Sequence, residues 1–163
     1  MFTKPLRNLA ESILDSARQA NLKIATAESC TGGLIVGLLT EIAGSSDVVD
    51  RGFVTYSNQA KTDMLGVTLD LLIDYGAVSA EVARAMAEGA VKQSSADLAV
   101  SVTGIAGPGG GSETKPVGLV HFACARKGRE TLHERHVFDG DRSAVRKSAV
   151  TTALKLLQRQ LAN

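Results

Sequence analysis

The side chains best suited to chemistry gather in one short segment, residues 26–33 (TAESCTGG). A short apolar run of strand length precedes it, and an apolar run of helix length follows. Turns between a strand and a helix bind ligands in α/β folds, because free helix N–H groups point outward there. Gly32 and Gly33 have no Cβ, so a ligand can approach the backbone closely. The alternative is a plain helix cap, in which Ser29 or Thr31 satisfies N–H groups.

Ser29 and Thr31 are both possible nucleophiles, and Thr31, Gly32 and Gly33 are candidate substrate-binding residues. An alcohol nucleophile needs a base, and Lys61 is the candidate. A lysine acts as a base only when burial or a nearby cation lowers its pKa. A Ser–Lys pair is a recognised form of nucleophile activation. Tyr56 could orient Lys61 or relay a proton, and N–H groups of residues 30–33 could stabilise an oxyanion. Taken alone, Lys61 also fits a solvated helix lysine, and Cys30 fits either a competing nucleophile or a small packed residue.

The three histidines, His121, His133 and His136, all fall in a predicted hairpin that we expect to lie away from these polar groups. His133 and His136 are three positions apart on a strand, so they face opposite sides and make a poor metal pair. We therefore expect neither a Ser-His-Asp triad nor a metal site.

A glycine-rich run at 103–111 is the third polar segment. It lacks the Gly-Lys-Ser/Thr of a phosphate-binding Walker loop, and Ser112 replaces the last glycine of a G-x-G-x-x-G pattern. The run is thus only a weak sign of a ligand loop, and a mobile lid is the alternative. Its candidate substrate-binding residues are Thr103, Gly104, Gly107 and Gly109.

The composition indicates an ordinary globular domain. The chain has 163 residues, of which 44% are apolar and 21% charged, with a net charge of +1. This charge, with two tyrosines, four phenylalanines and no tryptophan, argues against partners such as nucleic acid or an anionic membrane. No apolar run approaches the roughly 20 residues of a membrane span. No secretory leader is expected, and the distant Cys30 and Cys124 fit free thiols in the cytoplasm.

Hydrophobic periodicity and capping residues predict alternating helices and strands. We expect Asn58 and Asp141 to cap two of the helices. The predicted helices cover 5–20, 32–42, a segment from 58, 68–75, 79–94 and 141–161. The predicted strands cover 22–26, 48–57, 98–102, 117–125 and 131–138.

This order predicts a single α/β domain with a mixed, mainly parallel sheet and helices on both faces. If the first three strands are parallel, their carboxyl ends share one edge of the sheet. The polar segments 28–33, 56–61 and 103–111 then meet there. This convergence is the main argument for an active site.

Three segments, TAESCTGG (26–33), GFVTYSNQAK (52–61) and VTGIAGPGGGSETKPVG (102–118), together resemble the CinA C-terminal family. The resemblance covers nearly the whole chain. It implies a metal-independent and cofactor-independent Ser–Lys amidase that hydrolyses the carboxamide of nicotinamide mononucleotide. Long members of the family carry a further N-terminal domain with a separate pyrophosphatase activity, which should not be transferred.

The resemblance also implies roles for individual residues. Ser29 corresponds to the nucleophile and Lys61 to its base, with Tyr56 and Thr103 as supporting residues. We expect the loop 103–111 to contact the ribose phosphate. Arg142 and Arg146 are further candidates for phosphate ligands, although surface placement is the ordinary expectation for both.

Two other classes of function stay open at this point. The same glycine loops could bind a nucleotide without turnover, in a regulatory domain linked to competence or DNA damage. A pure binding site, however, has no need of a serine and a lysine on separate loops. A DNA-associated competence protein is disfavoured by the net charge. A homodimer is plausible, but no apolar stripe marks its interface.

Overall fold

The computed structural model describes residues 2–163, and its elements follow the order expected from the sequence. A short 3-10 helix at Ser45–Asp47 is the only addition within those residues. The helices are α1 (Lys4–Gln19), α2 (Leu34–Thr40), α3 (Asn58–Leu65), α4 (Leu69–Tyr75), α5 (Ala80–Lys92) and α6 (Arg142–Ala162). The strands are β1 (Ile24–Glu28), β2 (Val49–Val54), β3 (Leu98–Gly104), β4 (Leu119–Arg126) and β5 (Leu132–Val137).

The strands form one mixed sheet in the order β2-β1-β3-β4-β5. β1 pairs in parallel with both β2 and β3, whereas β4 is antiparallel to β3 and β5. The predicted α/β class and the parallel arrangement of the first three strands are therefore confirmed. Their carboxyl ends share one edge, as the argument from convergence requires.

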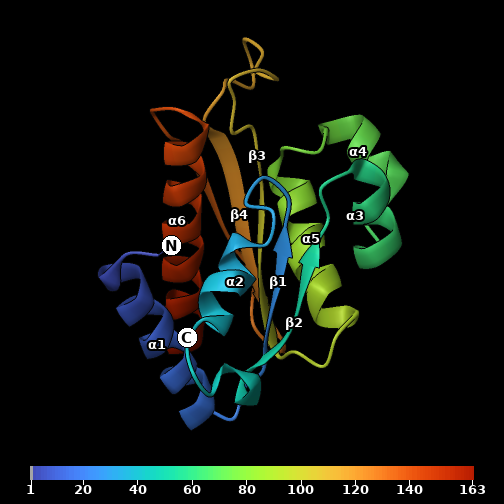
Figure 1. Ribbon diagram of the computed structural model, residues 1–163. Helices are drawn as coiled ribbons and strands as arrows, with labels where there is room; N and C mark the ends of the chain where they lie inside the picture. Colours follow the sequence, from blue (N-terminus) through green and yellow to red (C-terminus); the bar gives the residue numbers. More distant parts are fainter. Residues whose placement is uncertain (1) are drawn as a thin grey trace.

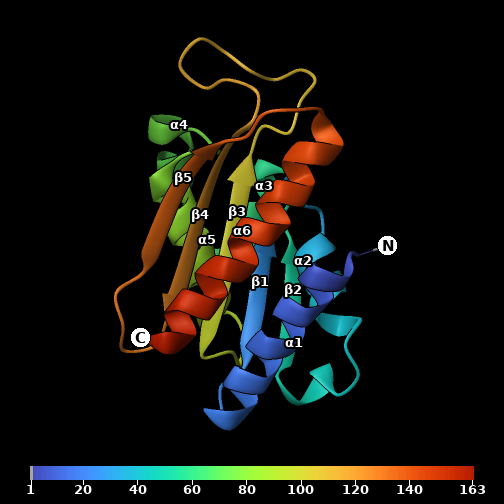
Figure 2. The same ribbon diagram turned by 90° about the vertical axis from the view of Figure 1, so that its left-hand side faces the viewer.

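Helices cover both faces of this sheet (Figure 1). Helices α1, α2 and α6 lie on one face, and α3, α4 and α5 lie on the other. Figure 2 shows α6 crossing the first face beside α1. Every residue of β1 is buried, and so is nearly all of the central strand β3. Such continuous burial is typical of strands covered on both sides.

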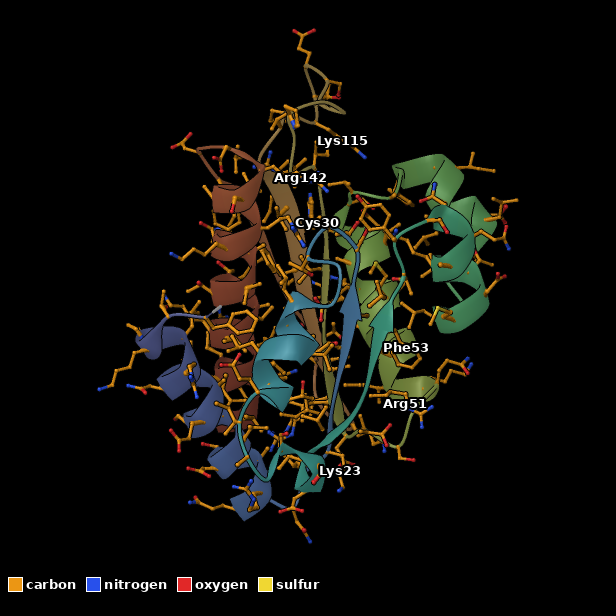
Figure 3. All side chains as sticks on the ribbon, viewed as in Figure 1. Lys23, Cys30, Arg51, Phe53, Lys115 and Arg142 are labelled. Atoms are coloured by element: carbon orange, nitrogen blue, oxygen red, sulfur yellow. The ribbon has the colours of Figure 1, made fainter. Side chains whose placement is uncertain are left out.

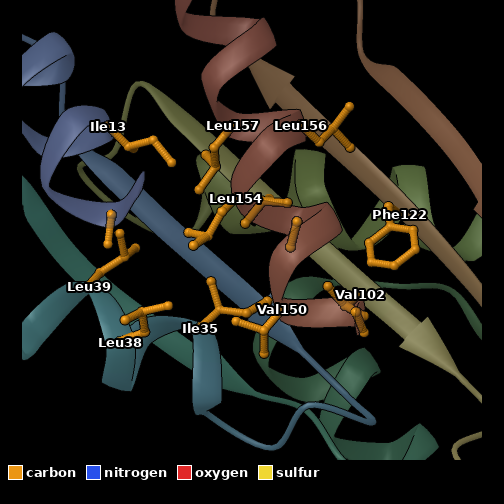
Figure 4. Packing of buried hydrophobic residues seen from close by; sticks show 14 of the residues in the cluster. Ile13, Ile35, Leu38, Leu39, Val102, Phe122, Val150, Leu154, Leu156 and Leu157 are labelled. Carbon is orange, nitrogen blue, oxygen red and sulfur yellow. The ribbon is translucent and has the colours of Figure 1, made fainter. Parts of the chain in front are cut away.

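The larger core lies between the sheet and the first group of helices (Figure 4). Leu154 and Leu157 of α6 pack there with Ile35 and Leu38 of α2 and with Val102 of β3, and all five are fully buried. Burying one such side chain stabilises a fold by roughly 1.5–3 kcal/mol. This core therefore holds α6 firmly against the end of β3.

Several boundaries differ from the prediction for physical reasons. β1 extends to Glu28, because its ladder continues to Val54 on one side and Val102 on the other. Helix α2 starts two residues later than predicted, because Gly32 and Gly33 have φ angles of +59° and +93°, which an α-helix cannot contain. The turn that follows β1 therefore shifts from the predicted 27–31 to 29–33.

The predicted cap at Asn58 is wrong by one position. Ser57 is the N-cap of α3, and its hydroxyl accepts the Ala60 N–H at 3.0 Å. The cap predicted at Asp141 is confirmed, and Ser79 caps α5 in the same way, since each side chain accepts an N–H from the first turn of its helix. Within residues 2–163, none of the helices combines the length and apolar character needed to cross a bilayer.

Candidate active site

Ser29 lies directly beyond the last residue of β1, at the shared carboxyl edge of the parallel strands. Its N–H donates to the Val102 carbonyl at 3.0 Å, so the pairing with β3 continues through Ser29. On the other side, the Thr55 N–H donates to the Glu28 carbonyl at 2.9 Å. Ser29 itself is only 9% exposed. Figure 3 labels the neighbouring Cys30 at this end of the sheet.

The carboxylate of Glu28 fixes the turn that follows Ser29. Glu28 is fully buried and accepts four hydrogen bonds of 2.9–3.1 Å. The donors are the Thr26 hydroxyl and the N–H groups of Gly33, Ile35 and Val36. The carboxylate thus does the work of a helix cap for α2, whose own N-cap is a glycine. This role of Glu28 was not predicted from the sequence. The one sign of it there is a carboxylate shortly before a helix that begins with glycines.

Lys61 reaches Ser29 from α3, which lies on the face of the sheet opposite to α2. It follows the Ser57 cap of α3, and only 1% of it is exposed. Its Nζ lies 3.2 Å from Ser29 Oγ and donates to the Thr55 carbonyl at 3.0 Å. The structure therefore brings together the serine and the lysine that the sequence singled out. Lys61 is therefore not a solvated helix lysine, which was the alternative that the sequence left open.

Burial determines the protonation of Lys61. Removal from water disfavours the charged ammonium and lowers the pKa of Lys61 from its usual 10.5, while Cys30 acts more weakly in the opposite direction. Both recorded hydrogen-bond partners of Nζ are uncharged oxygens. A neutral Lys61 amine can still donate to the Thr55 carbonyl and has a lone pair for the proton of the Ser29 hydroxyl.

Cys30 is not poised as a nucleophile. Burial raises the pKa of its thiol to about 11, although its own backbone N–H and the nearby Arg146 act in the opposite direction. Since the thiolate is the reactive form, a thiol with this pKa is almost entirely unreactive near pH 7. Its 6% exposure fits the small packed residue that we considered for this position.

The N–H groups in the turn after Ser29 differ in whether they have a hydrogen-bond partner. The Gly32 N–H donates to the Ser29 carbonyl at 3.1 Å, and the Gly33 N–H donates to the buried carboxylate described above. These two glycines therefore have no free donor for an oxyanion. Of the residues 30–33 expected to stabilise an oxyanion, only Cys30 and Thr31 remain. Within residues 2–163, no acceptor is recorded for the N–H of either Cys30 or Thr31.

Tyr56 lies at the mouth of the site rather than beside the lysine. It is 63% exposed, and its hydroxyl accepts from Arg142 Nη2 at 3.2 Å. Arg142 also donates through Nη1 to the Gly107 carbonyl at 2.8 Å. One arginine at the start of α6 therefore links the loop after β2 to the glycine-rich loop. No recorded hydrogen bond joins Tyr56 to Lys61, so proton relay through Tyr56 has no support from contacts.

Arg146 contacts the nucleophile turn itself. Its Nε donates to the Cys30 carbonyl at 3.1 Å, and its Nη2 donates to the Thr31 carbonyl at 3.1 Å. The sequence suggested only a phosphate ligand or a surface side chain at this position. Its actual contacts span more than a hundred residues of sequence, so no local pattern could have indicated them.

The remaining candidate residues differ in what they contact. Thr31 is fully buried, and its hydroxyl has no partner among the described residues. Thr103 points away from the turn, to the α5 face, where its hydroxyl donates to the Ala77 carbonyl at 2.7 Å. Gly104 lies in β3, where a Cβ would come within 2.9 Å of a β4 carbonyl oxygen. Gly109 has open space around it. Of these residues, only Thr31 belongs to the nucleophile turn.

The position expected for His121 is wrong. Because β4 runs antiparallel to β3, its first residues lie at the polar edge, and His121 pairs with Thr103. Its ring nevertheless lies on the α5 face, where Nδ1 is 3.0 Å from Nε2 of His133. Burial, with a smaller contribution from His133, lowers the pKa of His121 to about 4. In residues 2–163, no hydrogen bond joins a histidine to Ser29 or Lys61.

The described residues bring no three His, Cys, Asp or Glu side chains together in a metal-binding cluster. The side chains singled out at this edge offer a hydroxyl and an amine of lowered pKa, next to the Cys30 N–H, which has no recorded acceptor. That set suits nucleophilic attack on a carbonyl carbon.

Comparison with known proteins relates the chain to the CinA C-terminal domain family. The family model of the CinA C-terminal domain matches residues 6–161. The chain is 49% identical to nicotinamide-nucleotide amidohydrolase PncC of Escherichia coli K12, over 98% of this chain and 97% of that protein. It is 48% identical to a Caldicellulosiruptor saccharolyticus protein named for competence-damage induction, over 96% of this chain. The chain spans only 38% of the length of that second relative.

Solved structures agree with these matches. The crystal structure of a competence/damage inducible protein from Agrobacterium tumefaciens superposes with a TM-score of 0.96 at 52% identity. That match covers 100% of this chain and 99% of the other. A competence damage-inducible protein from Klebsiella pneumoniae gives a TM-score of 0.92 at 35% identity, over 97% of this chain and 98% of that one.

We expect Lys61→Met to stabilise the protein at neutral pH. A buried lysine of lowered pKa binds protons less readily in the folded chain than in the unfolded chain, so its penalty is full at low pH. The penalty fades as pH rises through the lowered pKa toward 10.5. Urea unfolding at pH 7 and pH 10 should show the advantage of the variant shrinking. The exposed Lys155→Met is the control, and an advantage independent of pH would contradict the account.

We expect Glu28→Gln to lower the free energy of unfolding by at least about 2 kcal/mol. The amide retains one acceptor oxygen, but its NH₂ group faces backbone donors that then lose their partner. Chemical denaturation measures the loss. Glu41→Gln is the control, because Glu41 forms only an exposed ion pair with Arg7 worth less than about 1 kcal/mol. Equal effects of the two substitutions would show that the buried carboxylate is not the anchor of α2.

Proposed function

We propose that this chain, which belongs to the CinA C-terminal domain family, is a nicotinamide-nucleotide amidase. It hydrolyses the carboxamide of nicotinamide mononucleotide to nicotinate mononucleotide and ammonia, a step that returns pyridine nucleotide for reuse. The name of the Escherichia coli relative, which this chain matches over nearly its full length, supports the choice of substrate. The observation that carries the proposal is the buried 3.2 Å contact between Lys61 Nζ and Ser29 Oγ.

In the first half of the reaction, neutral Lys61 accepts the proton of the Ser29 hydroxyl. Ser29 Oγ then attacks the carboxamide carbon, and the carbonyl oxygen becomes an oxyanion. The N–H group of Cys30 is the donor that we assign to it, because Thr31, whose N–H also has no recorded acceptor, is fully buried. One such donor is typically worth about a hundredfold to a thousandfold in rate.

The tetrahedral intermediate collapses when Lys61 returns the proton to the leaving nitrogen. Ammonia departs, and Ser29 carries the nicotinoyl group as an ester. A water molecule then gives a proton to Lys61 and attacks the ester carbon, which releases nicotinate mononucleotide and restores Ser29. The amine of Lys61 thus serves in turn as base and acid, a role that its lowered pKa favours.

The charge distribution suits an anionic substrate. Arg142 and Arg146 donate only to neutral oxygens, and neither has a carboxylate partner among the described residues. Arg142 is exposed beside Tyr56 and the glycine-rich loop, so its remaining donors can bind the ribose phosphate. We assign the phosphate to this position. Tyr56 borders the same position and supports Arg142.

The competing proposal is a nucleotide-binding domain without turnover, and a DNA-associated role is the third. Neither accounts for a lysine buried against a serine hydroxyl, because burying an amine is costly unless chemistry uses it. The homodimer and the location in the cytoplasm that the sequence suggested stay predictions.

We expect Ser29→Ala and Lys61→Ala each to lose at least about a thousandfold in kcat, and the double variant little more. The two residues act as a unit, so removing the second adds little. Ammonia release from nicotinamide mononucleotide measures the effect, and release by the wild type should resist a chelator. Cys30→Ala is the control and should stay active. Multiplicative losses in the double variant would show that the pair does not work together, and a folded but inactive wild type would favour binding without turnover.

We expect Arg142→Met to raise KM for nicotinamide mononucleotide by roughly tenfold to a hundredfold, as loss of a charged hydrogen bond predicts. Nicotinamide riboside, which lacks the phosphate, should be a poorer substrate of the wild type and should not respond to the substitution. Steady-state kinetics with both substrates measures this, with Arg129→Met in the distant hairpin turn as the control. Equal kcat/KM for the two substrates in the wild type would remove phosphate recognition from this loop.

A further inference from the structure

A small cavity lies where the N-terminal segment, the start of α2 and the first turns of α6 meet. Helices α1, α2 and α6 all contact one another on this face of the sheet, and Figure 2 shows α6 beside α1. The cavity has a volume of about 220 Å³. Pockets for drug-sized ligands typically measure about 300–1,000 Å³, so this one suits a smaller molecule.

The polar part of the cavity comes from one face of α6. Ser143, Arg146 and Lys147 follow the spacing i, i+3, i+4, which places their side chains next to one another. Within residues 2–163, no partner is recorded for the Lys147 ammonium, the Ser143 hydroxyl or Nη1 of Arg146. None of the described residues that line the cavity is acidic. Two positive charges and a hydroxyl therefore face the cavity without a neutralising group.

The remaining lining is mainly apolar. Phe2 and Leu6 come from the N-terminal segment and α1, and Leu34 is the first residue of α2. Leu6 is buried, whereas Phe2 and Leu34 are half-buried and pack against the main core. A ligand that matches this lining has a small apolar body and an anionic head. A carboxylate is the head that suits a guanidinium, because the two groups can form parallel hydrogen bonds.

We propose that this cavity binds a small organic monocarboxylic acid with an aromatic or branched aliphatic body. The carboxylate lies against Arg146 and Lys147, and the body lies against Phe2, Leu6 and Leu34. The site is separate from the mouth of the amidase site, because Arg142 and Tyr56 do not line the cavity. Inorganic phosphate has the charge but no apolar body, so it uses only half of the lining.

Arg146 connects this cavity to the nucleophile turn. Its Nε and Nη2 donate to the Cys30 and Thr31 carbonyls at 3.1 Å each, which leaves Nη1 for the acid. An acid that draws on this guanidinium weakens its hold on the two carbonyls, so occupancy of the cavity and the conformation of the turn are linked. We expect occupancy to lower kcat for nicotinamide mononucleotide and to leave KM unchanged. This consequence rests on the amidase function proposed above, whereas the binding itself does not.

The test uses benzoate, with benzamide as the matched neutral compound, because the two have nearly the same shape and differ in charge. Isothermal titration calorimetry on the wild type should show benzoate binding at least about tenfold more tightly than benzamide, as hydrogen bonds to charged groups predict. Inorganic phosphate should bind more weakly than benzoate. Lys147→Met should weaken benzoate binding by about tenfold, and since Lys147 is exposed the variant should fold. Lys155→Met, in the neighbouring groove, and Arg142→Met are the controls and should bind benzoate as the wild type does.

Three binding results would overturn the site. They are equal affinity for benzoate and benzamide, unchanged affinity in Lys147→Met, and a loss of affinity in Arg142→Met, which would move the acid to the mouth of the amidase site. Competition between benzoate and nicotinamide mononucleotide would overturn it in the same way. Unchanged kcat at saturating benzoate would overturn the link to the nucleophile turn. If the wild type does not hydrolyse nicotinamide mononucleotide, the amidase function fails, and the titrations still decide whether the cavity binds the acid.

Discussion

The buried carboxylate of Glu28 is the contact on which the geometry of the site depends. It accepts three backbone N–H groups from the start of α2 and one hydroxyl, with no cation beside it in these contacts. The positive end of the helix therefore compensates a full negative charge inside the protein. Because Glu28 is the last residue of β1, one side chain ties the end of the strand to the start of the helix. Ser29 lies in the turn between them, and its position is fixed from both sides.

This use of Glu28 has an electrostatic consequence for Lys61. The carboxylate nearest to Ser29 in sequence is fully engaged by α2, and the recorded partners of the lysine are a hydroxyl and a carbonyl. No carboxylate of the described residues pairs with Lys61, and the opposing effect of Cys30 is weaker than that of burial, so the pKa of Lys61 falls. Lys61 can therefore act as a base because it is buried and because no carboxylate in residues 2–163 pairs with it.

The parts of this protein that the sequence predicted are those determined locally. The cap at Asp141, the periodicity of the helices and the apolar inner strands depend on neighbours in the chain and appear as expected, whereas the cap of α3 is Ser57 and not the predicted Asn58. The pairing of Ser29 with Lys61 followed from one further rule, that parallel strands end at a common edge. Thr103 was misjudged because β3 is longer than its apolar run, and alternation along a strand then directs its side chain to the α5 face.

The roles of Glu28 and Arg146 could not be predicted, because each depends on how separate elements pack. Helix α6 shows why this matters for the site. Its later turns bury Leu154 and Leu157 in the main core, while its first two turns carry the arginines that hold the three loops. Those loops follow different strands and share no hydrogen-bonded ladder beyond the sheet edge. Helix α6 packs against the core through its apolar face, and its arginines contact all three loops. The packing of the core therefore also determines how the loops are aligned in the site.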